Sequence, residues 1–229
     1  MLFMKRRALQ REFGFTNWGG KRRGAGRKPA GERAGASHAK RAKLAARFPV
    51  LVTMRLRAGL RNLRADATHT LLGAAFAAGS KETFRVIEFS VQSNHLHLVA
   101  ESRDERALAR GMTGLTTRIA RGLNRLWRRK GKVFEDRYHA RILTSPRAVR
   151  IALIYVLNNA RKHGAWRGHG ADEFSSAPWF DGWKGPTRKG ADSCPRLLER
   201  ARTWLLSIGW RRHGLIDPLE LPVGAEVWA

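Results

Sequence analysis

Two histidines separated by one residue, His95 and His97, are candidate ligands for a metal ion. They lie in the run Asn94 to Leu98, whose alternating apolar residues are typical of a β-strand. Because side chains alternate along a strand, both imidazoles project from one face while Leu96 and Leu98 enter the other. Imidazoles about 6–7 Å apart on one face can bind the same divalent ion. Two ligands alone make a poor site, so the alternative is a pair of partly buried histidines that only form hydrogen bonds.

A tyrosine and an asparagine four residues apart, Tyr155 and Asn159, supply groups of a different kind. Both fall in the stretch 148–162, which we predict to be a helix, so they share one face about 6 Å apart along its axis. Asn159 can then supply a carbonyl oxygen as a third ligand beside the histidines. Tyr155 can attack a phosphate that the ion polarises and orients. The alternative for Tyr155 is a core aromatic residue whose hydroxyl is hydrogen-bonded.

The second of the two tyrosines, Tyr138, lies at the start of a predicted strand. No residue of a metal-binding type stands in helical register with it. We therefore interpret Tyr138 as a packing residue or as a platform for DNA bases.

The composition favours a polyanionic partner. Lys and Arg number 45 against 18 acidic residues, which gives a formal net charge of +27. Such an excess repels itself unless a polyanion compensates it, and nucleic acid is the obvious polyanion because each neutralised phosphate releases a counterion. No apolar run approaches the roughly 20 residues that a membrane-spanning helix needs. The opening residues run straight into Lys5, Arg6 and Arg7, so we do not expect them to form a secretory signal. The single cysteine, Cys194, suits a reducing compartment, so we expect a cytoplasmic, nucleoid-associated protein.

The apolar patterns predict an α+β fold with an antiparallel sheet. Strands are expected over 50–56, 84–91, 95–100 and the region 133–143, and helices over 66–78, 104–128 and 146–162. The order β-α-β-β-α-β-α is that of a ferredoxin-like, split βαβ core with one added helix. A further amphipathic helix is expected near 195–206. We divide the chain into a flexible basic arm (1–47), a core (48–165) and a helical C-terminal extension (166–229).

Two basic regions are candidates for contacts with DNA. The arm contains Arg27 and Lys28 in a Gly-rich stretch similar to hooks that enter the minor groove, but we favour a solvated linker that adds non-specific phosphate contacts. The second region is the long helix and the turn after it. Its candidates, of which any single one can equally be solvated surface, are Arg118, Arg121, Arg125, Arg128, Arg129 and Lys130.

Taken together, the segments resemble the single-tyrosine HUH transposases, and within them the REP-associated tyrosine transposases of bacteria. The resemblance covers roughly residues 48–165. It rests on His95-Leu96-His97, on the segment 133–142 with its Arg-Tyr strand, and on the helix from Tyr155 to Asn159 followed by a basic stretch. Many relatives have a proline where this chain has Ala160, which leaves open whether Asn158 or Asn159 is the matching asparagine.

The resemblance implies a specific chemistry. His95, His97 and Asn159 would bind Mg²⁺ or Mn²⁺, and Tyr155 would attack a phosphodiester of single-stranded or hairpin DNA. The products would be a 5′-phosphotyrosine link and a free 3′-hydroxyl. Whether the protein acts as a monomer or a homodimer is left open by the sequence. Two alternatives remain: a domesticated protein that binds a DNA or RNA hairpin without cleaving it, and a metal nuclease that uses water, with Glu101 or Asp136 as the base.

Overall fold

The computed structural model describes residues 42–162, 164–167, 170–185 and 198–222. The chain divides into two units, residues 1–37 and 38–229, and every described residue belongs to the second unit. The candidates Arg27 and Lys28 of the predicted arm therefore lie outside the described residues. Within the predicted arm, Leu44 is described and packs into the core.

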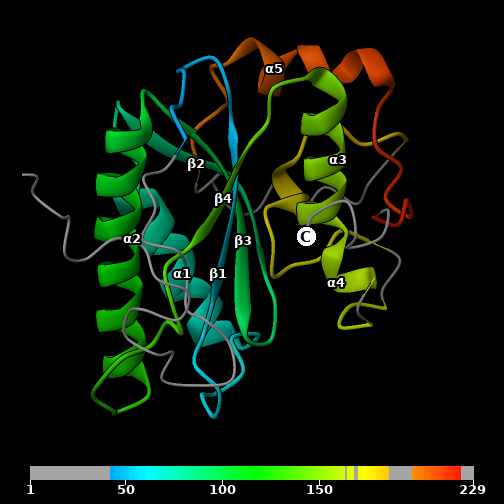
Figure 1. Ribbon diagram of the computed structural model, residues 1–229. Helices are drawn as coiled ribbons and strands as arrows, with labels where there is room; N and C mark the ends of the chain where they lie inside the picture. Colours follow the sequence, from blue (N-terminus) through cyan, green and yellow to red (C-terminus); the bar gives the residue numbers. More distant parts are fainter. Residues whose placement is uncertain (1–41, 163, 168–169, 186–197, 223–229) are drawn as a thin grey trace, which may run out of the picture. The chain divides into compact units, whose positions relative to one another are not determined.

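The fold is α+β, with a four-stranded antiparallel sheet in the order β2-β3-β1-β4 (Figure 1). The sheet confirms the predicted strands over 50–56, 84–91 and 95–100, and the fourth strand is shorter than the predicted region. The observed bounds are β1 (Val50–Arg55), β2 (Phe84–Val91), β3 (His95–Ser102) and β4 (His139–Ile142). Every residue of β2 is buried, because helices cover both faces of the sheet.

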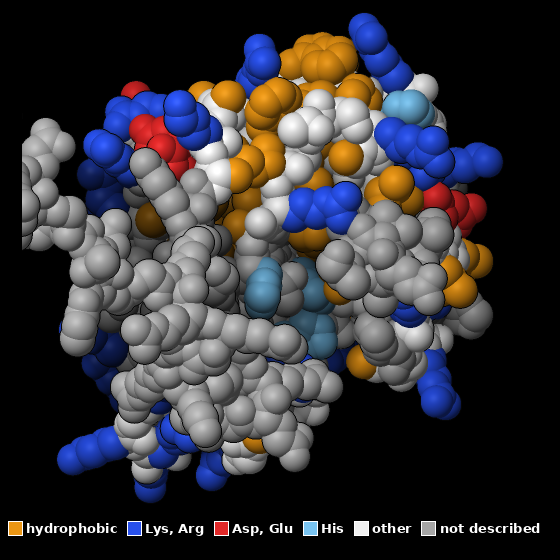
Figure 2. Space-filling view, in the orientation of Figure 1, with side chains coloured by type: hydrophobic (Ala, Val, Ile, Leu, Met, Phe, Trp, Pro, Cys, Tyr) orange, Lys and Arg blue, Asp and Glu red, His pale blue; other side chains and the backbone are white. Residues whose placement is uncertain are grey.

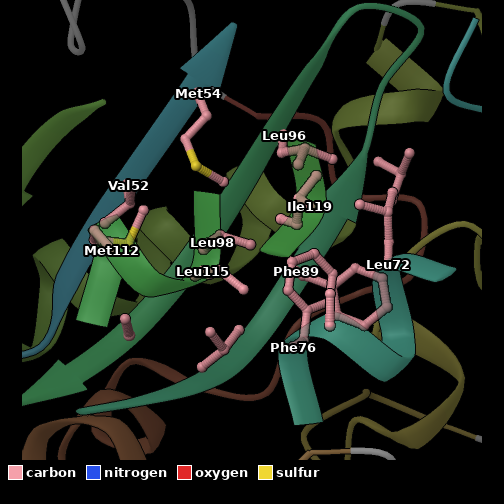
Figure 3. Packing of buried hydrophobic residues seen from close by; sticks show 14 of the residues in the cluster. Val52, Met54, Leu72, Phe76, Phe89, Leu96, Leu98, Met112, Leu115 and Ile119 are labelled. Carbon is pink, nitrogen blue, oxygen red and sulfur yellow. The ribbon is translucent and has the colours of Figure 1, made fainter. Parts of the chain in front are cut away.

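The two long helices before β4 pack on one face of the sheet. They are α1 (Asp66–Gly79) and α2 (Glu105–Leu126), and Asp104 caps α2 by accepting a 2.7 Å hydrogen bond from the backbone N–H of Ala107. Met54 and Leu98 from the sheet meet Phe76 and Leu115 from these helices in a closed apolar core (Figure 3). The buried side chains of this core are apolar, so the candidate catalytic residues lie on the other face of the sheet.

The opposite face is covered by α3 (Pro146–Leu157) and by parts of the C-terminal extension (Figure 1). Ser145 caps α3, and Pro146 occupies its first turn. The extension contributes η1 (Ala177–Trp179), α5 (Trp204–Ser207) and η3 (Gly209–His213), whose apolar side chains pack against α3. Trp210 is the largest of the fully buried side chains in the described residues.

Two helix predictions are wrong in part. The helix expected over 146–162 ends at Leu157, and α4 (Asn159–Lys162) follows it as a separate turn. The break falls at Asn158, whose side chain donates hydrogen bonds to the carbonyl oxygens of Asp217 and Glu220. These bonds join α3 to the C-terminal extension. They could not be predicted from the local sequence pattern, because the partners are about 60 residues apart.

The helix expected near 195–206 exists only as the single turn α5; residues 198–203 are described and are not helical. The backbone N–H groups of Arg202 and Thr203 donate to the carboxylate of Glu101 on β3 instead. A buried acceptor on the sheet therefore holds this segment extended, against its helical periodicity.

Candidate active site around His95, His97 and Tyr155

The two histidines project from the same face of β3, as the alternation predicts. Their ring centroids lie 4.7 Å apart, close enough for both rings to contact one ion. His95 is half-buried and His97 is 1% exposed. Leu96 and Leu98 enter the core on the opposite face. Figure 2 shows histidine side chains gathered in a hollow of the molecular surface, with basic side chains nearby.

Tyr155 of α3 lies directly against His97. Its hydroxyl oxygen is 3.4 Å from Nε2 of His97, and the ring centroids of the two residues are 4.7 Å apart. The hydroxyl is partly withdrawn from water, and this burial raises the pKa of Tyr155 above its usual value near 10. The folded chain thus brings together the tyrosine and the histidines, which are about 60 residues apart in sequence.

The other ring nitrogen of each histidine, Nδ1, faces an oxygen from a neighbouring residue. Nδ1 of His95 is 2.8 Å from the side-chain oxygen of Asn94, and Nδ1 of His97 is 3.0 Å from the hydroxyl of Thr53 on β1. An amide oxygen only accepts, so Nδ1 of His95 carries the proton. Its Nε2 then keeps a lone pair, which is the arrangement that metal-binding histidines use.

Asn159 is the first residue of α4, one position beyond the break in the helix. Its side chain is fully buried, and neither amide atom has a hydrogen-bond partner among the described residues. An unsatisfied buried amide is costly, so its oxygen is a natural position for a ligand or an ion. Two imidazole nitrogens and an amide oxygen fit a divalent cation such as Mn²⁺. The described residues contain no cluster of three or more His, Cys, Asp or Glu side chains that would make a competing site.

The side chain of Tyr138 lies on the other face of the sheet. It is half-buried and packs against the apolar core beneath α1 and α2, so the packing interpretation is confirmed. That core lies across the sheet from Tyr155. Tyr138 therefore packs on the sheet face opposite the histidine pair, and Tyr155 is the tyrosine that contacts His97.

The basic candidates on α2 are also on the far face. Arg118, Arg121 and Arg125 line a groove of about 650 Å³ between α1 and α2, on the side of the sheet opposite the histidines. Arg128 follows the end of α2 with a positive φ of 51°, and Lys130 is exposed in the turn. Arg129 is engaged locally, where it donates to the side-chain oxygen of Asn124. The fold does not bring this basic group together with the histidines.

The register of the sheet adds a residue that sequence reasoning missed. His139 on β4 pairs with Thr53, and Thr53 pairs on its other side with His97. Ile142 packs toward α1 and α2, so by alternation His139 and Arg141 face the side of the sheet that carries the histidine pair. His139 is exposed. Only the β1–β4 register reveals this, since nothing in the local sequence links the two strands.

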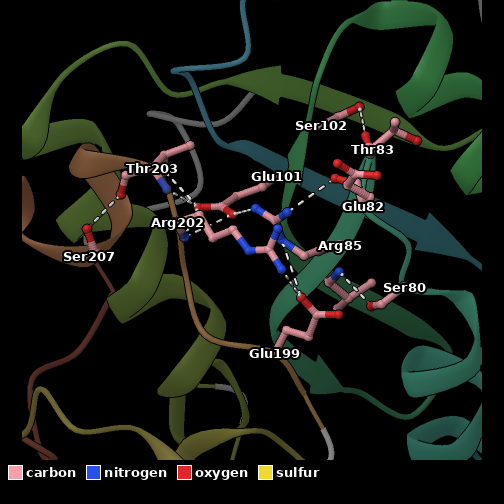
Figure 4. Close-up of polar contacts among 11 residues, drawn as sticks. Ser80, Glu82, Thr83, Arg85, Glu101, Ser102, Glu199, Arg202, Thr203 and Ser207 are labelled. Atoms are coloured by element: carbon pink, nitrogen blue, oxygen red, sulfur yellow. Dashed lines mark hydrogen bonds and ion pairs between the residues drawn. The ribbon is translucent and has the colours of Figure 1, made fainter.

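Glu101 belongs to a separate cluster. Its side chain is 2% exposed, and its carboxylate accepts hydrogen bonds from Arg85, Arg202 and Thr203 (Figure 4). Glu101 is also four residues beyond His97 on β3, about 13 Å along the strand. A carboxylate so far away and so fully engaged cannot act as the base of a water nuclease centred on the histidines.

Comparison with known proteins adds little to the site. No protein-family model and no curated protein matches the chain. A solved structure of a REP-associated tyrosine transposase bound to a REP hairpin is similar to 62% of this chain, over 82% of its own length, at 16% identity and a TM-score of 0.48. At that level the likeness establishes neither a shared fold nor a shared function. Among the described residues, no helix has the length and apolar character that crossing a membrane requires.

Proposed function

We propose that this chain cleaves and rejoins single-stranded DNA, with Tyr155 as the nucleophile and the two histidines as metal ligands. One observation carries the proposal: the Tyr155 hydroxyl lies 3.4 Å from Nε2 of His97, which stands beside His95 on one sheet face. A tyrosine that merely filled the core would need no imidazole at its hydroxyl. The element order and the strand order β2-β3-β1-β4 also agree with a ferredoxin-like, split βαβ core.

His95, His97 and Asn159 would hold Mg²⁺ or Mn²⁺. When bound, such an ion polarises the non-bridging oxygens of a phosphodiester and orients the phosphate for in-line attack. This assignment is supported by the lone pair on Nε2 of His95 and by the buried amide of Asn159, which has no hydrogen-bond partner in the described part of the chain. The charge of +27 would supply phosphate contacts beyond the site, with Arg141 on the same sheet face as the histidines.

In the proposed reaction, the oxygen of Tyr155 bonds to the phosphorus and the bond from phosphorus to the 3′-oxygen breaks. The DNA 5′ end is then linked to Tyr155, and the proton that the Tyr155 hydroxyl gives up is balanced by the proton that the departing 3′-oxygen takes up to become a hydroxyl. Attack of a 3′-hydroxyl on the phosphotyrosine reverses the step, so rejoining needs no external energy source.

A specific observation favours a second candidate, a hairpin-binding protein that does not cleave. Arg118, Arg121 and Arg125 line a groove away from the site, so nucleic acid could be bound there without reaching Tyr155. Binding therefore does not separate the two candidates; only covalent chemistry does.

The test is an adduct assay. The protein is mixed with labelled single-stranded DNA hairpins, drawn from the sequence that flanks its own gene, and with Mn²⁺, and is then run on a denaturing gel. We expect label at the mass of the protein, lost in Tyr155→Phe and in the double variant His95→Ala/His97→Ala. Tyr138→Phe is the matched control and should keep the adduct. Tight binding with no cleavage would support the non-cleaving candidate, and cleavage without an adduct would refute the tyrosine mechanism.

A further inference from the structure

Thr53 holds a central place on the sheet face that carries the histidines. On β1 it pairs directly with His97 of β3 on one side and with His139 of β4 on the other. Directly opposed side chains in antiparallel strands have Cβ atoms about 4.5–5.5 Å apart. The Thr53 hydroxyl uses this closeness: it lies 3.0 Å from Nδ1 of His97.

We propose that Thr53 is a positioning residue, which accepts a hydrogen bond from Nδ1 of His97 and so keeps the proton off Nε2. Nε2 is the nitrogen that faces Tyr155, at 3.4 Å. The role of Thr53 in ion binding rests on the function proposed above, whereas its effect on the position of the imidazole proton does not.

Two proton arrangements are compatible with the distances around His97. In the first, Nδ1–H donates to Thr53 and the Tyr155 hydroxyl donates to Nε2. In the second, the Thr53 hydroxyl donates to Nδ1 and Nε2–H donates to the oxygen of Tyr155. A neutral imidazole carries one proton, so only the first arrangement leaves a lone pair on Nε2 for an ion.

Two observations favour the first arrangement. A phenol is a stronger hydrogen-bond donor than an aliphatic alcohol, so Tyr155 is the better donor and Thr53 the better acceptor of the two hydroxyls around His97. His95 is organised in the same sense, because the oxygen of Asn94 can only accept from its Nδ1. Thr53 and Asn94 thus act alike, each turning one histidine so that its Nε2 is the basic nitrogen.

The first measurement is the position of the imidazole proton, read from the ¹⁵N chemical shifts of the histidine ring nitrogens by NMR. In the unmodified protein, we expect His97 to be protonated on Nδ1 and not on Nε2. In Thr53→Val, which keeps the shape but removes the acceptor, this preference should be lost, while Thr53→Ser should restore it. Protonation of Nε2 in the unmodified protein would overturn the proposal, whether or not any variant folds.

The second measurement is Mn²⁺ affinity, followed by the decrease of the free Mn²⁺ signal in electron paramagnetic resonance. Loss of a partner that orients a metal-binding histidine costs about 10–100-fold in affinity, which is the decrease expected for Thr53→Val. Thr53→Ser should stay close to the unmodified protein, and so should the control Thr113→Val on the far face. An unchanged affinity in Thr53→Val would refute the role of Thr53 in ion binding. Absence of Mn²⁺ binding by the unmodified protein would instead refute the metal site of the proposed function, and the NMR result would still decide the proton position.

Discussion

Replacing Glu101 by glutamine tests whether this buried carboxylate is structural. Its oxygens accept from the guanidinium of Arg85, from the backbone N–H groups of Arg202 (2.9 Å) and Thr203 (2.7 Å), and from the Thr203 hydroxyl (2.8 Å) (Figure 4). Glutamine keeps the shape but removes the charge and turns one acceptor into a donor. Arg85, itself 7% exposed, then loses its buried counter-charge.

Removing one partner of a buried ion pair costs about 3–5 kcal/mol. Arg85 keeps a second carboxylate, that of Glu199, at 3.7 Å, although this side chain is 46% exposed. We therefore expect the lower end of the range, about 3 kcal/mol, for Glu101→Gln. For a chain of this size the melting temperature should fall by roughly 6–12 °C.

The assay is urea unfolding followed by tryptophan fluorescence. Glu199→Gln is the matched control, because it removes the exposed partner of the same arginine and should cost less than about 1 kcal/mol. The double variant Arg85→Met/Glu101→Gln should recover part of the loss, because it removes both buried charges together while the side-chain oxygen at position 101 still accepts from the segment at Arg202 and Thr203. If Glu101→Gln were no more destabilising than Glu199→Gln, the claim that this cluster fixes the C-terminal extension to the sheet would be wrong.

Three further changes have expected outcomes of definite sign. Gly111→Ala should lower the free energy of unfolding by about 1–3 kcal/mol in urea, because the added Cβ would lie 2.2 Å from the buried ring of Phe84. The control Gly114→Ala, on the same helix, places its Cβ where no atom lies within 4 Å, so it should be neutral or stabilising. Burial lowers the pKa of His69, so the unfolded chain binds a proton on this residue more readily than the folded chain, and stability should fall as the pH drops below about 6.5. His69→Gln should flatten the dependence of the urea midpoint on pH between about 7 and 5, and an unchanged slope would contradict this explanation. Tyr155→Phe removes a hydroxyl that competes with the ion for Nε2 of His97, so Mn²⁺ binding should tighten about 2–10-fold. Weaker binding would mean that the hydroxyl assists the binding of the ion instead.

The sequence by itself was enough to predict those features that depend on local periodicity. The alternation of His95, Leu96, His97 and Leu98 predicts a strand with both imidazoles on one face, and the structure confirms it, because the pleat alone sets that direction. The apolar stripe of α2 predicts a long helix in the same way, since a stripe that steps by three and four residues matches the turn of the helix. The local pattern also places Tyr155 on a helix, whereas the packing of that helix near this strand was expected only from the family resemblance.

Tertiary structure alone decided which distant groups meet. The partnership of Thr53 with His97, and the place of His139 beside them, depends on strand register, which no single segment encodes. The break at Asn158 arises from hydrogen bonds to the C-terminal extension, and the extended backbone at Arg202 arises from the buried carboxylate on β3. At Arg202 and Thr203, the hydrogen bonds to the buried Glu101 carboxylate outweigh a local helical preference of a few tenths of a kcal/mol per residue. The arginines of α2 and the histidines lie on opposite faces of the sheet, and this separation exists only once the strands have assembled into that sheet.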